Sequence, residues 1–124
     1  MIAVDSSSWI AYLSGATGRD VEALDFAVSQ EQAVLPPVVL AELFSDPKLL
    51  AKTAQRLKEL PLLEVLDGYW ERAGSLRSRV LARGLRARLA DCLIAQSCLD
   101  HDVPLITRDS DFGHFVPAGL KLFP

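Results

Sequence analysis

The sequence contains few of the residues that mark disulfide-rich, zinc-binding or membrane-spanning proteins. Its 124 residues include only two cysteines and two histidines, and no apolar run approaches the roughly 18 residues that a membrane span needs. Cys92 and Cys98 lie six positions apart in one predicted helix, so their side chains point in different directions and are expected to be buried free thiols. The N-terminus lacks a basic region followed by an apolar stretch, and we therefore expect a cytoplasmic protein without membrane association.

An excess of positive charge is missing as well. Lysine and arginine number 13 against 16 aspartates and glutamates, which gives a net charge of -3 and an isoelectric point near 5.3. This balance argues against a protein that coats nucleic acid through bulk charge. One basic stretch departs from the average, and it comprises Arg77, Arg79, Arg83, Arg86 and Arg88. It is either a solvated helix face or a surface that binds nucleic-acid phosphates.

The chain does have enough apolar residues for one hydrophobic core. Half of the residues are apolar and 23% are charged, a balance typical of folded domains. The length fits a single domain over residues 1–124 and is too short for two.

Apolar runs alternate with amphipathic segments along the chain. Strands are predicted at 1–4, 33–35, 62–66, 103–107 and 120–123. Helices are predicted at 6–15, 19–29, 38–45, 47–60, 68–82 and 89–99, the first of them capped by one of the serines at positions 6–8. This alternation predicts an α/β fold with a central parallel sheet of four to five strands and helices on its faces.

Four acidic residues from distant parts of the chain are expected to meet at one edge of this sheet. Asp5 and Asp109 each follow a predicted strand. Glu42 is expected early in the helix after the second strand, and Asp91 in the first turn of the helix that leads into the fourth. Because strands end and the following helices begin at the same edge of a parallel sheet, the four side chains should converge there.

Such a convergence of negative charge needs a counter-ion. At about 7 Å and an effective dielectric near 20, each pair of carboxylates costs roughly 2 kcal/mol. Oxygen ligands without histidine or cysteine suit Mg²⁺ or Mn²⁺, which also bind nucleotide phosphates, so the cluster predicts metal-assisted phosphodiester cleavage. Asp5 and Asp91 are expected to bind metal directly, Glu42 to orient a water or complete the shell, and Asp109 to complete a second site.

Each acid also has an ordinary structural explanation. Asp5 can cap the helix that follows it, and Asp91 can interact favourably with a helix dipole. Asp109 and Asp111 can be turn formers. Glu42 is the least ordinary of the set, because it interrupts the apolar run from Val38 to Phe44. The joint placement of the acids favours a site more than any single residue does.

The same residues resemble a known family. The segments that look like the successive motifs of a PIN domain are Val4–Ser7, Ala41–Leu43, Ala90–Ala95 and Leu105–Phe112. In size and lack of accessory domains the chain is similar to the VapC toxins of type II toxin–antitoxin systems.

The resemblance implies a Mg²⁺- or Mn²⁺-dependent endoribonuclease with a parallel α/β/α sandwich. It also implies a homodimer, a cognate antitoxin that binds across the active-site groove, and targets such as transfer RNA or ribosomal RNA. The family's acidic positions match Asp5, Glu42, Asp91 and Asp109. Thr107 matches a hydroxyl residue often seen near them, and Asp111 matches a position that is acidic in many members and is a further candidate metal ligand.

Two other functions fit parts of this pattern. A phosphorylated receiver domain needs an acidic pair after the first strand and a lysine after the last, whereas Asp5 is followed by three serines and Lys121 lies inside the predicted last strand. A catalytically silent PIN-like module that only binds a partner remains the alternative, although the intact set of four acids disfavours it.

Overall fold

Three parallel strands form the centre of the protein, which a computed structural model describes over residues 1–124. The strands lie in the order β2-β1-β3, and they are β1 (Ile2–Val4), β2 (Ala33–Val34) and β3 (Leu105–Ile106). The register pairs Ala3 with both Val34 and Leu105. Every strand residue is buried, which explains why the strands are continuous apolar runs instead of alternating patterns.

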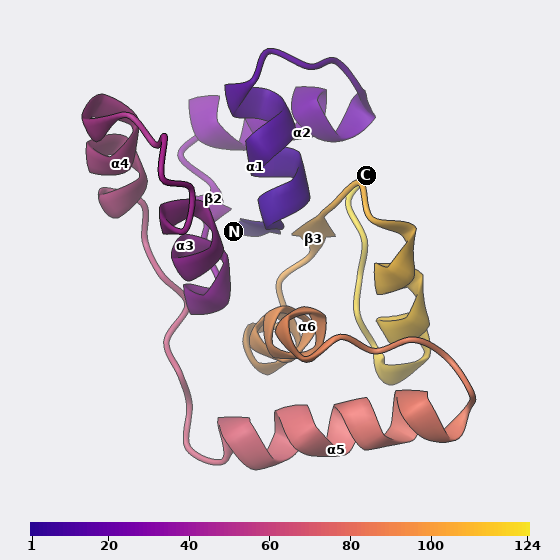
Figure 1. Cartoon of the computed structure of the whole chain (residues 1–124). Coiled ribbons are helices and arrows are strands. Elements are labelled where there is room, and N and C mark those ends of the chain that lie inside the picture. The colour runs from indigo at the N-terminus through magenta and orange to yellow at the C-terminus, as the bar shows by residue number, and fades with distance from the viewer.

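Helices cover both faces of this sheet (Figure 1). They are α1 (Ser6–Leu13), α2 (Arg19–Ser29), α3 (Pro37–Phe44), α4 (Ala51–Lys58), α5 (Tyr69–Ala82), α6 (Leu89–His101) and the 3-10 helix η1 (Ser110–Ala118). Helices α1 and α2 lie on one side of the sheet, α6 lies on the other, and α5 packs against α6 farther out. The expected α/β/α sandwich is therefore confirmed. The longest helix has 14 residues, and none combines the length and the apolarity that crossing a bilayer requires.

The sheet has fewer strands than the four to five expected. The segments at 62–66 and 120–123 contribute one isolated parallel bridge each, Leu35 with Leu62 and Leu105 with Leu122. Leu62 is 48% exposed and Leu122 is 42% exposed, so neither run is held between two helical layers as the three strands are. The apolar composition of these runs was therefore a misleading signal for extended strands.

Several helix boundaries also differ from the sequence prediction, among them the start of α4 and the end of α6. The helix expected over 47–60 begins only at Ala51, because the Asp46 carboxylate accepts a hydrogen bond of 2.9 Å from the Lys48 amide and holds a turn there. Helix α6 continues to His101 and ends at Asp102, which adopts the left-handed conformation with φ of 50°. Cys92 and Cys98 are buried free thiols in α6, as expected.

The segment after β3 was left without a predicted element, and it forms η1. Phe112 and Phe115 from this helix are fully buried in the main core. Their burial anchors the chain directly after Asp109, so the carboxyl edge of β3 is fixed on both sides.

Candidate active site

Asp5 lies immediately after the central strand β1 and is 4% exposed. Its carboxylate accepts hydrogen bonds of 2.8 Å from the Ser6 amide and 2.7 Å from the Ser7 hydroxyl. Asp5 is therefore the N-cap of α1, which confirms the capping role considered for it, and none of the three serines that follow is the cap. The same capping geometry fixes the carboxylate at the edge of the sheet.

Thr107 joins the ends of the two neighbouring strands β1 and β3. Its hydroxyl donates a hydrogen bond of 2.9 Å to Asp5 Oδ2 and accepts one of 3.0 Å from the Asp109 amide. One hydroxyl thus bridges two of the four predicted site residues. The adjacent parallel pairing of β1 and β3 makes this bridge possible, because both strands end at the same edge.

Asp109 is the N-cap of η1, and its carboxylate accepts a hydrogen bond of 2.9 Å from the Asp111 amide. The turn-forming role considered for Asp109 is therefore correct, and it holds the side chain beside Thr107. Asp111 lies in the first turn of η1.

Asp91 and Glu42 come from two helices that pack against each other, α6 and α3. Asp91 lies in the first turn of α6, as expected. Glu42 is the sixth residue of α3, so its expected place early in that helix was wrong. The helix starts at Pro37, where proline needs no amide partner, and Glu42 follows in the second turn.

The electrostatics show that the four acids face a common region. The pKa of Asp91 is raised to about 6, first by burial and then by the charges of Asp109, Asp5 and Glu42, against the opposing charge of Arg88. Burial also raises the pKa of Glu42, where the Ser6 hydroxyl opposes the shift and the Asp5 charge adds to it. Asp111 is not among the charges that act on Asp91.

The donor set fits a hard divalent cation in its chemistry. It consists of carboxylate oxygens that repel one another, and such hard ligands suit Mg²⁺ or Mn²⁺. No three of the acidic, histidine or cysteine side chains are already arranged as a closed metal-binding group. The carboxylates therefore influence one another electrostatically but do not form a group that could hold a metal ion as they stand.

A bidentate ion pair connects α2 to the segment after β3 that carries Thr107 and Asp109. Arg108, between Thr107 and Asp109, donates hydrogen bonds of 2.8 and 3.0 Å to the two carboxylate oxygens of Asp20. The Ser8 hydroxyl donates a further bond of 2.8 Å to Asp20. The hydrogen bonds from Arg108 are the largest cause that lowers the pKa of Asp20 to about 2. No pattern in the sequence indicates this pair, because only the fold brings α2 to the end of β3.

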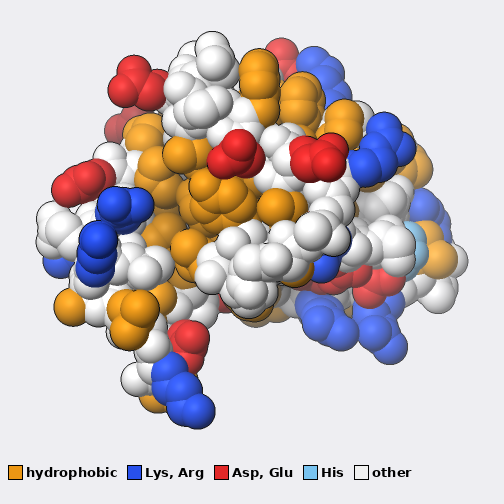
Figure 2. Space-filling view, turned by 90° about the horizontal axis from the view of Figure 1, so that it is seen from above, with side chains coloured by type: hydrophobic (Ala, Val, Ile, Leu, Met, Phe, Trp, Pro, Cys, Tyr) orange, Lys and Arg blue, Asp and Glu red, His pale blue; other side chains and the backbone are white.

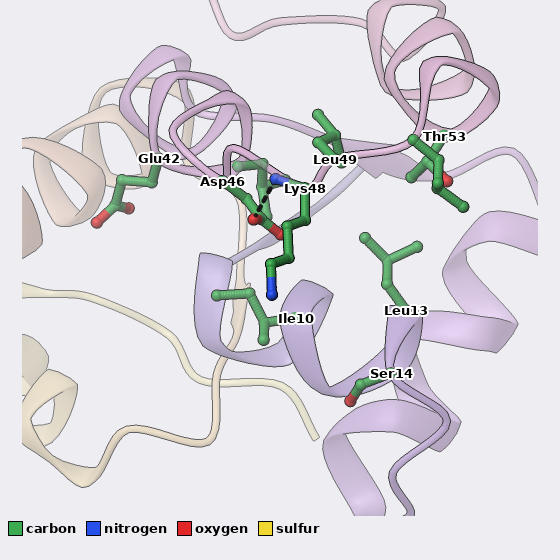
Figure 3. A pocket seen from close by; sticks show the side chains of 10 residues that line it. Ile10, Leu13, Ser14, Glu42, Asp46, Lys48, Leu49 and Thr53 are labelled. Carbon is green, nitrogen blue, oxygen red and sulfur yellow. Dashed lines mark hydrogen bonds between the residues drawn. The ribbon is translucent and has the colours of Figure 1, made fainter.

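An apolar groove of about 370 Å³ lies beside the acids, between α1 and the α3–α4 region. This α1–α4 groove is defined by its lining residues Ile10, Leu13, Ser14, Glu42, Leu43, Asp46, Lys48, Leu49, Leu50 and Thr53. Hydrophobic side chains gather in the middle of this face of the molecule, and charged side chains surround them (Figure 2). Glu42 stands at one end of the groove, with its carboxylate directed away from Leu13 and Thr53 (Figure 3).

The family of the chain follows from a comparison with known domains. The family model for the PIN domain matches residues 2–116, which is nearly the whole chain. The chain belongs to the PIN domain family. No curated protein matches this PIN domain at a significant level.

Solved structures with the same fold come from several bacteria. A chain of FitAcB from Neisseria gonorrhoeae is 22% identical with a TM-score of 0.71, and the match covers 100% of this PIN domain and 97% of that chain. A chain of VapBC2 from Rickettsia felis, bound to a promoter DNA fragment, is 20% identical with a TM-score of 0.76, and the match covers 99% of this PIN domain and 98% of that chain. A chain of VapBC-5 from Mycobacterium tuberculosis, a member of the VapBC family of toxin–antitoxin systems, is 22% identical with a TM-score of 0.69. The match covers 98% of this PIN domain and 98% of that chain. These likenesses confirm the PIN fold that the sequence motifs predicted.

Proposed function

We propose that this PIN domain is a metal-dependent endoribonuclease and the toxin of a toxin–antitoxin pair. The observation that carries the nuclease proposal is that carboxylates from four separate elements act on one another, since the charges of Asp109, Asp5 and Glu42 add to burial in raising the pKa of Asp91 to about 6. An acidic cluster that destabilises its own charged form is suited to binding a cation.

The residues divide into roles according to how they are held. Asp5 and Asp91 would bind Mg²⁺ or Mn²⁺ directly, with Glu42 completing the shell or orienting a water molecule. Asp109 would complete a second site, with Asp111 as a further ligand. When bound, the cation supplies Lewis acidity, which favours a hydroxide nucleophile and offsets negative charge on the phosphate. Ser7 and Thr107 orient the Asp5 carboxylate through their hydroxyl groups.

The nuclease proposal is tested with purified protein and RNA. Transfer RNA, ribosomal RNA and an unstructured RNA are incubated with Mg²⁺, Mn²⁺ or EDTA, and products are mapped at nucleotide resolution. We expect cleavage only with the divalent cations. Asp5→Asn and Asp91→Asn should each reduce the rate at least about 100-fold, because each removes a charged ligand.

The matched control is Asp25→Asn, which changes an exposed acid on α2 and should leave the rate unchanged. Undiminished cleavage by the Asp91→Asn protein would show that the site is misassigned. Absence of cleavage of all three RNAs with either cation would favour the alternative of a catalytically silent PIN-like module.

The partner we propose is a cognate antitoxin that covers the α1–α4 groove and reaches the acids. The groove supports this proposal because half of its lining residues are hydrophobic and Glu42 stands at one end. A partner segment with apolar side chains and a basic residue at one end would complement it. The fold is shared with chains of VapBC assemblies, one of which belongs to a family of toxin–antitoxin systems.

The antitoxin proposal is tested by co-expression with the product of the neighbouring gene. Leu50 is 70% exposed in the groove, and Leu50→Glu should weaken the complex at least about 10-fold while cleavage is retained. Phe26→Glu, an equally drastic change of an exposed residue outside the groove, is the control. Equal weakening by both variants, or none by Leu50→Glu, would contradict this binding mode.

We also propose that the protein is a homodimer, as the family resemblance implies. Light scattering of the purified protein should give twice the 13.6 kDa mass of one chain. A mass of 13.6 kDa at micromolar concentration would exclude a stable dimer and leave the nuclease proposal untouched.

A further inference from the structure

The segment 83–88, which connects α5 to α6, concentrates positive charge in a protein of negative net charge. Five of the 13 lysines and arginines lie between positions 77 and 88, and that stretch contains no acidic residue. Three of them belong to the connecting segment itself, namely Arg83, Arg86 and Arg88. The proposed cleavage chemistry uses none of these side chains.

The backbone of this segment is held in a defined shape. Gly84 adopts a φ of +75°, a conformation that L side chains rarely adopt, and turns the chain out of α5. The Arg77 guanidinium donates a hydrogen bond of 2.8 Å to the Ala87 carbonyl, and Ala87 is buried. The His114 ring lies 2.9 Å from the Arg86 carbonyl, which ties the segment to η1. The segment is therefore anchored to the helix that Asp109 caps.

Two guanidinium groups of this anchored segment have no partner in the chain. The three ion pairs of the protein join Arg72 to Asp100, Arg108 to Asp20 and Lys121 to Asp102. Arg86 and Arg88 belong to none of them and are exposed. Their backbone is fixed by other side chains, so the two guanidinium groups are free to bind an anion from outside.

Arg88 also lies beside the carboxylates. It is the N-cap of α6, three residues before Asp91, and its carbonyl accepts a hydrogen bond of 3.1 Å from the Cys92 amide. Residues three apart at the start of a helix are neighbours on its surface. The charge of Arg88 correspondingly lowers the pKa of Asp91, against the combined effect of burial and the other acids.

We propose that Arg86 and Arg88 form a phosphate-binding element that holds the backbone of an RNA strand where it enters the carboxylate site. A polyanion that approaches four acids is repelled, and fixed cations at the edge of the cluster offset that repulsion. Guanidinium groups suit this task because their planar donors match phosphate oxygens. The choice of RNA as the strand rests on the proposed function, whereas the phosphate-binding role rests on the segment itself.

The test measures binding apart from cleavage. Anisotropy of a labelled single-stranded RNA of about 12 nucleotides is recorded with the Asp91→Asn protein in EDTA over a range of salt concentrations. Adding Arg86→Ala and Arg88→Ala should raise the Kd at least about 10-fold at low salt. The slope of log K against log salt should fall by about 1.4, since each phosphate contact on a single strand contributes about 0.7.

Two further variants give the measurement its controls. Replacing both arginines by lysine keeps the charge and should recover most of the salt dependence with weaker binding. Arg56→Ala removes one exposed charge from α4, which lies across the molecule from this segment, and should change the Kd less than about twofold (Figure 1).

The outcomes separate this inference from the nuclease proposal. If the doubly substituted protein, shown by circular dichroism to be folded, binds RNA as tightly as its parent, the inference is overturned even if cleavage is observed. If binding depends on the two arginines but no RNA is cleaved with any metal, the inference stands and the nuclease proposal fails.

Discussion

The acids of the candidate site differ in how the protein holds them. Asp5 is buried and receives hydrogen bonds from one amide and from the hydroxyls of Ser7 and Thr107. Asp91 has no such donors, and its pKa of about 6 results first from burial and then from its acidic neighbours. A half-buried carboxylate without donors is costly to ionise. Hydrogen bonds within the protein therefore stabilise the Asp5 carboxylate, whereas the Asp91 carboxylate would be stabilised by a bound cation.

The first prediction concerns the free energy of unfolding that the protein loses when Asp91 is ionised. Its folded pKa of about 6 lies above the ordinary 3.8, so the folded state binds the proton more tightly than the unfolded state. Stability of the metal-free protein therefore falls as pH rises from about 4 to about 6 and is then level. At pH 7.5 Asp91→Asn should gain on the order of 2 kcal/mol, about 5 °C or more in Tm.

Differential scanning fluorimetry in EDTA at several pH values provides the check. At pH 4 the difference between the two proteins should vanish, because the carboxyl is then protonated in the folded protein. A gain of the same size at both ends of the pH range would contradict the assignment to Asp91 ionisation.

The second prediction concerns Thr107, whose single hydroxyl serves both Asp5 and the Asp109 amide. Thr107→Val keeps the shape and removes the hydroxyl, which leaves the Asp109 amide without a partner and takes one of three hydrogen bonds from Asp5. We expect a loss of about 1–3 kcal/mol in the free energy of unfolding and slower cleavage. Thr107→Ser should retain most of both. Urea unfolding and initial rates measure these effects, and equal behaviour of the valine and serine variants would show that the hydrogen bonds are unimportant.

At the scale of elements, the sequence pattern predicted the three central strands correctly, whereas its predictions of strands at the margins of the sheet were wrong. The three central strands were predictable because burial on both faces requires uninterrupted apolar runs. The runs at 62–66 and 120–123 are similar in composition, yet each makes one bridge at the margin of the sheet. Whether a short apolar run is flanked by two layers or one depends on tertiary packing, which local patterns do not contain.

The same distinction holds for the site. The convergence of Asp5, Asp91 and Asp109 followed from counting strand and helix ends along the sequence. The place of Glu42 early in its helix was wrong, because position 42 is the fifth residue of the predicted helix 38–45 and the sixth of α3, beyond the first turn in both. The support from Asp20 joins positions 88 residues apart, and no spacing rule connects them.

The third prediction concerns this connection between α2 and the end of β3. The pKa of Asp20 is about 2, below its ordinary 3.8, so the pair with Arg108 stabilises the fold above about pH 4 and loses its effect as pH falls toward 2. Arg108 is 39% exposed, and solvent screening limits the contribution to about 1 kcal/mol. Asp20→Asn should lose this amount at pH 7 in urea unfolding. Arg108→Lys should lose only part of it, and no loss in either variant would mean that solvent fully screens the pair.

At the scale of the whole molecule, charge is separated into regions with different tasks. The carboxylates lie at the carboxyl edge of the sheet, the unpaired arginines lie in the segment that leads into α6, and the α1–α4 groove lies beside Glu42. The net charge of -3 hides this arrangement. Composition alone therefore excluded a protein with bulk positive charge but not a local phosphate-binding element.

The fourth prediction uses the folded molecule as the indicator of metal binding. A cation that binds only the folded protein, at ten times its Kd, stabilises it by about 1.4 kcal/mol. Mg²⁺ or Mn²⁺ should therefore raise the Tm of the native protein by about 5 °C at pH 7.5. Asp91→Asn should show a much smaller rise, and equal rises in both proteins would place the cation elsewhere.

The hydrogen bond between Thr107 and Asp5 also has a consequence for protein synthesis. It joins residues 102 positions apart, and β1 reaches its place between two strands only when β3 arrives beside it. A nascent chain on the ribosome therefore displays Asp5 long before Thr107 and Asp109 have been added. The carboxylate cluster is incomplete until those residues have left the exit tunnel, so the candidate site forms only when synthesis of the chain is almost finished.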